Sequence, residues 1–232
     1  MPEQPLVSVI MNCFNGEKYL REALDSVLAQ TYSNWELIFW DNQSTDQSAE
    51  IFRSYDDPRF KYFHAANHTL LYEARNYAVS RSQGEFVAFL DVDDWWSPEK
   101  LKISIEYLQR GADIVFHDLW RVTRIGQQRY RKRAKSYQPD AASPVSDLMI
   151  RGNALPNSSV VVRSECIRAI GGVSEDRNLI SVEDYDAWLR LAERGDRFRR
   201  IDSCLGYYWQ GGGNTTAYAG RPAASRYQTV YE

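Results

Sequence analysis

The feature that most constrains the fold is the alternation of short apolar runs with amphipathic helical segments over the first half of the chain. Residues 6–14 form a continuous apolar run, which is typical of a strand covered on both faces. Similar runs predict strands at 35–40, at 59–64 and from residue 86 onward. Strands that alternate with helices imply an α/β fold with a mainly parallel sheet flanked by helices.

The predicted helices have apolar residues at three-and-four spacing, and each has a candidate cap or terminator. They are residues 15–28 with Asn15 as the N-cap, a segment through Phe52 capped by Ser44 or Thr45, and residues 69–82 ended by Gly84. The second half is less regular. Its predicted elements are strands at 113–118, 158–163 and 204–210 and a helix at 182–195 ended by Gly195.

Polar clusters follow three of the predicted strands. They are Asn12 to Asn15, Asp41 to Ser44, and Asp91 to Asp94. Ligands of parallel α/β sheets gather at the carboxyl ends of the strands. We therefore expect the three clusters to meet at one edge of the sheet and to form the functional site.

The third cluster contains three carboxylates within four residues, Asp91, Asp93 and Asp94. Neighbouring carboxylates repel by about 4 kcal/mol at ~4 Å and an effective dielectric constant near 20. One or two of them could cap the helix that Ser97-Pro98-Glu99 begins. The other interpretation is a Mg²⁺ or Mn²⁺ ion, which commonly takes one or two carboxylates together with substrate phosphates.

Composition narrows the class of protein. A net charge of −3 argues against a general nucleic-acid binder. The three cysteines, Cys13, Cys166 and Cys204, suggest neither a disulfide framework nor a zinc site, so a reducing, cytoplasmic environment is expected. The sequence shows no signal peptide and no apolar stretch of ~20 residues. The protein is predicted to be soluble or attached to the inner membrane face.

Four blocks of sequence carry a family resemblance. They are VSVIMNCFNGEKYLREALDSVLAQTY, ELIFWDNQSTD, EARNYAVSRSQGEFVAFLDVDDWWSPEKL and VEDYDAWLRLAERG. In order and spacing they resemble the family 2 inverting nucleotide-sugar glycosyltransferases of the A-type (GT-A) fold. The resemblance covers roughly residues 6–210. It implies one domain over 1–232, with a Rossmann-like nucleotide-sugar-binding half (6–118), an acceptor and catalytic-base half (119–216) and a tail (217–232).

The resemblance also implies roles for individual residues. Nucleotide contacts would come from Asn12, Phe14, Glu17, Asp41, Arg75 and Asp91. Asp93 would be the preferred direct ligand of Mn²⁺ or Mg²⁺, and Asp91 would face the ribose or a metal-bound water. The family usually continues Asp41 with Asp-Gly-Ser, whereas this chain has Asn42-Gln43-Ser44.

Asp184 matches the catalytic base of the family. An inverting transfer is a single in-line displacement, so one carboxylate must take the proton of the attacking hydroxyl. Without the other blocks, Glu183 and Asp184 would be explained by the favourable position of acids in the first turn of a helix. Asp186 lies on roughly the opposite helical face and is interpreted as structural.

Aromatic residues and Glu183 supply candidate sugar or acceptor contacts. Trp95 or Trp96 could stack on a sugar ring or pack in the core, and Trp188 could line the acceptor cleft or pack. The family's Arg and His after the last strand are absent from YYWQGGGNTT. Water or Asn214 could replace that histidine as a ligand, and the glycine-rich segment could instead form a lid.

The basic segment 121–138 has seven basic residues and no acid. It is interpreted as a solvated hairpin or flexible loop, or else as a contact for a phosphate-bearing acceptor or an anionic membrane.

The leading hypothesis is metal-dependent, inverting transfer of a sugar from a nucleoside diphosphate-sugar, with UDP-sugars favoured, to a hydroxyl of a glycan or lipid-linked glycan in cell-surface polysaccharide synthesis. A sugar-phosphate nucleotidyltransferase would need a glycine-rich basic loop after the first strand, and MNCFNGEKY is not such a loop. A degenerate domain that only binds nucleotide or glycan is the remaining alternative.

Overall fold

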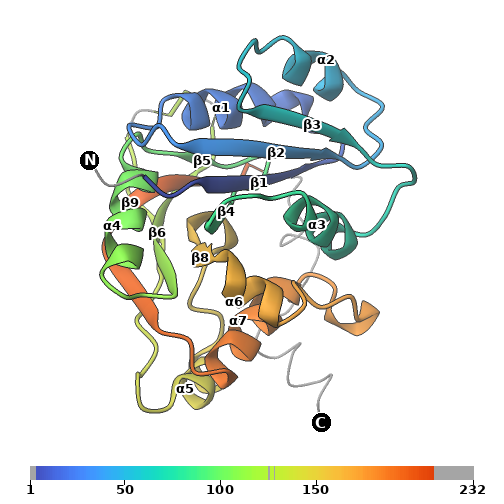
Figure 1. Ribbon diagram of the computed structural model, residues 1–232. Helices are drawn as coiled ribbons and strands as arrows, with labels where there is room; N and C mark the ends of the chain where they lie inside the picture. Colours follow the sequence, from blue (N-terminus) through green and yellow to red (C-terminus); the bar gives the residue numbers. More distant parts are fainter. Residues whose placement is uncertain (1–3, 125, 128, 212–232) are drawn as a thin grey trace.

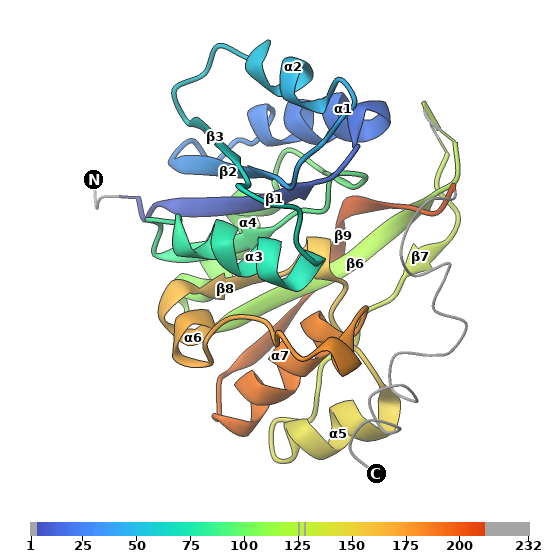
Figure 2. The same cartoon turned by 90° about the vertical axis from the view of Figure 1, so that its right-hand side faces the viewer.

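The computed structural model describes residues 4–124, 126–127 and 129–211, and these residues form one α/β unit around a single nine-stranded sheet (Figures 1 and 2). The strand order is β3-β2-β1-β4-β8-β6-β9-β5, with β7 paired to β6. The strands are β1 (Val7–Cys13), β2 (Trp35–Asp41), β3 (Phe60–His64), β4 (Phe86–Phe89), β5 (Trp95–Trp96), β6 (Ile114–Val122), β7 (Arg133–Ala134), β8 (Val161–Arg163) and β9 (Phe198–Trp209).

The amino-terminal half of the sheet is parallel throughout. Strand β1 pairs in parallel with β2 and β4, and β2 pairs in parallel with β3. Strand β8 runs antiparallel between β4 and β6, and β6 and β9 then pair in parallel. The predicted α/β fold with a mainly parallel sheet is confirmed.

Helices cover both faces of the sheet (Figure 2). They are α1 (Glu17–Leu28), α2 (Ser48–Arg53), α3 (Leu71–Ser80), α4 (Lys100–Gln109), α5 (Pro144–Arg151), α6 (Ser164–Ala169) and α7 (Glu183–Glu193), with 3-10 turns at Asn157–Ser159 and Arg177–Leu179. Helices α1, α2 and α4 share one apolar core with Val7, Val9 and Met11 of β1. Helices α3, α6 and α7 share the other core, to which Ile10 of β1 belongs.

Two predicted helix caps are wrong. Asn15 adopts a left-handed φ of 53°, and Gly16 is the N-cap of α1. The amides at the start of this helix are instead satisfied from segment 44–48: Ser44 accepts the amide of Asn15, Ser48 that of Gly16, and Asp46 that of Glu17. Helix α2 begins at Ser48 with Gln47 as its N-cap, so neither Ser44 nor Thr45 caps it. Capping here depends on a contact between distant segments, which local sequence does not contain.

In the second half of the chain, the bounds and the number of the helices and strands differ from the prediction. Strand β9 begins six residues earlier than expected, at Phe198, because it pairs with the full length of β6. Helices α5 and α6 were not expected. Leu119 and Trp120 pair with β7, so the basic segment forms a hairpin, as one of the two structural interpretations predicted. None of the helices in the described ranges is both long and apolar enough to cross a membrane.

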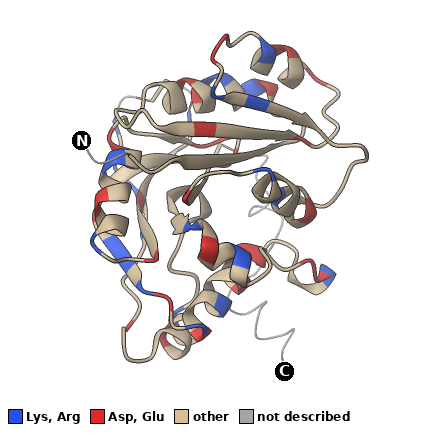
Figure 3. Ribbon diagram, viewed as in Figure 1, with Lys and Arg blue, Asp and Glu red and all other residues tan. Residues whose placement is uncertain are grey.

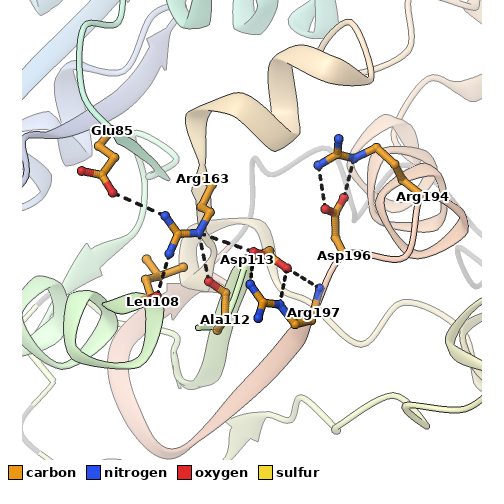
Figure 4. A network of polar contacts seen from close by, with 8 residues as sticks. All are labelled: Glu85, Leu108, Ala112, Asp113, Arg163, Arg194, Asp196 and Arg197. Carbon is orange, nitrogen blue, oxygen red and sulfur yellow. Dashed lines mark hydrogen bonds and ion pairs between the residues drawn. The ribbon is translucent and has the colours of Figure 1, made fainter. Parts of the chain in front are cut away.

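Charged side chains lie mostly on helices and loops, and β1 and β4 carry none (Figure 3). At the sheet edge where β4, β6 and β9 begin, several charged side chains are paired with one another (Figure 4). Arg163 reaches Glu85 and Asp113, and Asp113 also pairs with Arg197 at 2.8 Å. Ion pairs therefore cover part of this edge of the sheet.

Candidate active site

The carboxyl ends of β1, β2 and β4 meet at one edge of the sheet, as predicted. Cys13 lies opposite Asp41, and the Asn42 amide donates to the Cys13 carbonyl at 2.8 Å. On the other side of β1, the Leu90 amide donates to the Ile10 carbonyl at 3.0 Å. The three polar clusters therefore surround one end of β1.

Gly16 allows the start of α1 to approach the acidic turn closely. A Cβ atom at this position would lie 2.8 Å from Val92 Cγ2 and 2.9 Å from Cys13 Sγ, closer than side chains tolerate. Val92 stands between the two acids of the Asp-x-Asp motif. The glycine thus holds the helix and the acidic turn in direct contact.

Asp41 shapes the turn after β2. Its side chain is buried, Oδ1 accepts the Ser44 amide at 2.8 Å, and Oδ2 accepts the Tyr62 hydroxyl. At the centre of the turn, Gln43 adopts a left-handed φ of 71°, where the family usually has glycine. As placed, Asp41 presents no exposed surface for a nucleotide base.

Phe14 is one of two predicted nucleotide contacts with exposed side chains, and the other is Glu17. The side chain of Phe14 is 51% exposed, and its ring centroid lies 4.4 Å from that of His68. Asn12, near the end of β1, is half-buried, and its Nδ2 has no hydrogen-bond partner among the described residues. Glu17 is exposed and accepts the Gln47 amide, so it also links α1 to α2.

The three acids after β4 have different surroundings. Asp94 is buried and accepts the Trp209 amide at 2.9 Å, so it fixes the end of β9. None of the three caps α4, whose N-cap is Glu99. Asp91 and Asp93 stay half-exposed. Burial, reinforced by the charge of Asp91, raises the pKa of Asp93 to about 6.

Arg75 joins the acidic turn to helix α7. Its Nη2 lies 3.3 Å from Asp91 Oδ1, and its Nη1 lies 3.3 Å from Glu183 Oε1. Arg75 and Glu183 are both nearly inaccessible to solvent, with 5% and 6% of their side chains exposed. The predicted metal motif and the predicted catalytic helix therefore belong to one ionic network.

Asp184 lies in the first turn of α7, beside this network. Burial, together with the charges of Glu183 and Asp91, raises the pKa of Asp184 to about 7, and the charge of Arg75 opposes this rise. A carboxyl with this pKa can accept a proton near neutral pH. Asp186 points elsewhere and pairs with Arg190 at 2.7 Å, which agrees with its structural interpretation.

The loop between α5 and the 3-10 turn at 157–159 supplies two residues that sequence reasoning missed. Asn157 Nδ2 donates to Asp91 Oδ1 at 2.9 Å, and Asn153 Nδ2 lies 3.4 Å from Asp184 Oδ2. One short loop thus contacts both carboxylates of interest. Asparagines in an irregular segment carry no periodic signal, and nothing in the sequence marks these two or His68.

The predicted tryptophan contacts have different positions. Trp95 is half-exposed and stacks on Tyr207 with 5.6 Å between ring centroids. Trp96 is buried and donates its indole N–H to the Ser158 carbonyl at 2.7 Å. Trp188 is fully buried and packs edge-on against Phe89. The interpretation of Trp188 as an acceptor contact is therefore wrong, because its face of α7 turns into the core.

Comparison with known sequences assigns the family. The sequence model of Glycosyl transferase family 2 matches residues 8–167. The chain belongs to glycosyltransferase family 2. It is 30% identical over 210 residues to TuaG of Bacillus subtilis, a glycosyltransferase named for teichuronic acid biosynthesis. That alignment covers 88% of this chain and 79% of TuaG.

Solved structures share the fold of this family 2 glycosyltransferase. S. aureus TarS 1–349 in complex with UDP-GlcNAc superposes with a TM-score of 0.74 at 22% identity, over 93% of this chain and 61% of that one. The mannosyltransferase PcManGT of Pyrobaculum calidifontis, in complex with GDP-Man and Mn²⁺, has a TM-score of 0.68 at 17% identity, over 94% and 60%. The GT-A fold is confirmed, and the chain spans about three fifths of each of these two structures.

The acidic turn of this glycosyltransferase suits a divalent cation whose remaining coordination positions are filled by a bound ligand and water. Among the described residues, no group of three His, Cys, Asp or Glu side chains is arranged to hold a metal. Asp91 and Asp93 offer two carboxylates, and burial and then the charge of Asp91 raise the pKa of Asp93, so a cation would favour its ionised form. Mg²⁺ and Mn²⁺ use such pairs together with phosphate oxygens and water. Asn214, considered above as a further ligand, lies outside the described residues.

Proposed function

We propose that this protein is a metal-dependent, inverting glycosyltransferase that moves a hexose from a nucleoside diphosphate-sugar to a hydroxyl of a glycan or lipid-linked glycan. A UDP-sugar is the favoured donor, and the proposed setting is polysaccharide synthesis at the cytoplasmic face of the membrane. Three comparisons support it, since TarS was solved with UDP-GlcNAc, PcManGT with GDP-Man and Mn²⁺, and TuaG is named for teichuronic acid biosynthesis.

The observation that carries this proposal is the position of Arg75 between Asp91 and Glu183. A donor that binds at the acidic turn would have its sugar close to the first turn of α7. Asp184 in that turn has a pKa of about 7, and a base of this kind is what the acceptor hydroxyl requires.

In the proposed mechanism, Asp184 accepts the proton of the attacking hydroxyl while the acceptor oxygen displaces the diphosphate from the opposite face of the anomeric carbon. Arg75 keeps Glu183 and Asp91 in place and so positions the two halves of the site. Asp91 and Asp93 would hold Mn²⁺ or Mg²⁺, which stabilises the negative charge of a departing diphosphate when it is bound.

The remaining roles concern the donor. Phe14 offers an exposed ring on which a base can stack, with His68 beside it. Asn12 has an unpaired donor group at the same strand end. Trp95, which continues the acidic turn and is half-exposed, is the proposed sugar contact, and buried Trp96 holds that turn to Ser158.

The test combines donor binding with turnover. We expect UDP-, GDP-, CMP- and dTDP-sugars to be distinguished by the thermal shift that they cause with Mn²⁺, and Asp93→Asn to lose the Mn²⁺-dependent part. Asp184→Asn should retain donor binding and lose transfer by a factor of about 10² to 10⁴, the usual contribution of a general base. Asp186→Asn, in the same helix turn but paired with Arg190, is the matched control and should retain transfer.

Two results would contradict the proposal. Normal turnover by Asp184→Asn would remove the assignment of the base, and the absence of any Mn²⁺- or Mg²⁺-dependent donor uptake would remove the metal site. Donor binding by the wild-type protein without transfer or donor hydrolysis would favour the degenerate, binding-only domain. The observation that favours this alternative is the left-handed Gln43, which stands in place of the glycine of the family's Asp-Gly-Ser turn.

A further inference from the structure

The tip of the β6–β7 hairpin encloses a basic groove that the proposed mechanism does not use. The groove has a volume of about 770 Å³. Its lining includes Arg121, Arg124, Arg129, Arg131, Lys132 and Gln210. We call this hollow the basic groove. All five basic side chains are exposed, so their charged ends are available to a ligand.

The charges of the basic groove are not neutralised by the rest of the described chain. Of the seven basic residues between 121 and 135, Arg133 alone forms an ion pair with a described carboxylate, Asp118 at 3.1 Å. Three arginines at the opposite edge of the sheet, Arg163, Arg194 and Arg197, are by contrast ion-paired (Figure 4). Five cations that share one hollow repel each other unless an anion joins them.

The basic groove adjoins the acidic turn of the candidate active site. The Gln210 amide donates to the Val122 carbonyl at 2.7 Å, and the preceding residue, Trp209, donates to Asp94. Aromatic contacts run along the same path. Tyr130 of the hairpin lies 4.8 Å from Tyr207, and Tyr207 stacks on Trp95. A molecule held in the basic groove is therefore close to the residue proposed to contact the transferred sugar.

The chemistry of the lining favours phosphate. Four of the five basic residues are arginines, whose planar forks bind two phosphate oxygens at once. The donor diphosphate is already assigned to Asp91 and Asp93, so the anion in the basic groove belongs to another molecule. A membrane surface fits less well. The groove is concave, and the exposed large apolar side chains of the described chain, such as Ile150 and Ile180, lie outside the hairpin.

We propose that the basic groove binds the phosphate or diphosphate group of the acceptor substrate. This inference rests on the proposed function, because it names the class of acceptor for the same transfer reaction. It assigns the enzyme to acceptors that carry phosphate near the hydroxyl to be glycosylated, and it gives the basic hairpin the role of recognising them.

The probe is inorganic pyrophosphate, titrated at low salt in EDTA so that no cation assists binding at Asp91 and Asp93. The wild-type protein should bind it, and binding should weaken as NaCl rises from about 50 to about 500 mM. The double variant Arg121→Ser/Arg131→Ser should bind at least about tenfold more weakly. The matched control is Arg110→Ser/Arg199→Ser, which removes two exposed, unpaired arginines from a smaller hollow roughly 26 Å away, where β6 and β9 begin.

The control pair should leave pyrophosphate binding unchanged. Equal weakening of pyrophosphate binding in both double variants, or no pyrophosphate binding by the wild-type protein, would overturn the inference.

A flotation assay with phosphatidylglycerol and phosphatidylcholine vesicles distinguishes a membrane phosphate from the phosphate of an acceptor. Loss of phosphatidylglycerol binding in the groove variant with unchanged pyrophosphate binding would also overturn it, in favour of a membrane surface. Both double variants should keep the Mn²⁺-dependent donor shift. Asp93→Asn should lose the Mn²⁺-dependent donor shift but still bind pyrophosphate. This result would show that the basic groove and the donor site are tested independently.

Discussion

Arg75 and Glu183 are 108 positions apart in the chain, yet Nη1 of the arginine lies 3.3 Å from Oε1 of the glutamate. Glu183 directly precedes the proposed base, and the same guanidinium reaches Asp91 of the acidic turn. The pair therefore connects α3 to α7 and sets the position of Asp184 relative to the proposed metal ligands. Several of the following predictions depend on this connection.

Removing the guanidinium of Arg75 should lower the stability of the protein and raise the pKa of Asp184. Arg75→Gln leaves buried Glu183 without a counter-charge, and we expect the free energy of unfolding to fall by about 3 kcal/mol in urea denaturation. Arg75 also lowers the pKa of Asp184, so the acid limb of the pH–rate profile should move to higher pH. Arg197→Gln, which removes an exposed ion pair with Asp113, should change stability far less than Arg75→Gln and leave the profile unchanged.

Activity should rise with pH through the pKa of Asp184. The groups that face Asp184 are Glu183, Asp91 and Arg75, and burial is the largest cause of its raised pKa of about 7. Since the base works as the carboxylate, kcat/KM, which reports the pKa values of the free enzyme, should reach half of its plateau near pH 7. A profile that is flat between pH 5.5 and about 8 would contradict this assignment.

The raised pKa of Asp184 makes activity rise with pH but makes stability fall with pH. A carboxyl whose pKa is higher in the folded than in the unfolded state binds more protons when folded, so its contribution is present below pH 4 and is lost as pH rises through about 7. Asp184→Asn should therefore gain stability relative to the wild-type protein as pH is raised from about 4 to about 8. Thermal unfolding of both proteins across this range measures the difference.

Asn157 and Asn153 should separate donor binding from turnover. Asn157→Ala removes the amide that donates to Asp91 at 2.9 Å, so the Mn²⁺-dependent affinity for the donor should fall about tenfold. Asn153→Ala removes the contact with Asp184, so kcat should fall while donor affinity stays within about a factor of two. Equal effects of the two substitutions on donor affinity would show that the loop acts only through stability.

Gly16→Ala should disturb the acidic turn by overpacking. The added methyl would lie 2.8 Å from Val92 Cγ2, and a misfit of this kind costs about 1–3 kcal/mol. The double variant Gly16→Ala/Val92→Ala should recover part of the stability, because Cys13 Sγ remains 2.9 Å away. Chemical denaturation measures both losses. A single variant as stable as the wild-type protein would show that the turn and α1 can separate without cost.

Local patterns were sufficient for strands β1 to β4 and for the edge at which they end, but not for β5, β7 or the start of β9. The apolar runs of β1 and β2 are continuous because both faces of the sheet are covered, and parallel strands must place their carboxyl ends together. The order of the residues alone therefore assigns the three polar clusters to one edge. Helix boundaries were less accurate. The caps of α1 come from Ser44, Asp46 and Ser48, which no local rule connects to Asn15.

The chain by itself thus determined the α/β class, the strand ends and the types of residue available for chemistry, since these follow from periodicity over neighbouring positions. The tertiary structure decided which acids act together. It buried Asp94 against the Trp209 amide and Asp41 beneath its turn, turned Trp188 into the core, and brought Arg75 to Glu183. These outcomes depend on packing between segments that are tens to more than a hundred residues apart, and side-chain spacing along the chain carries no information about such contacts.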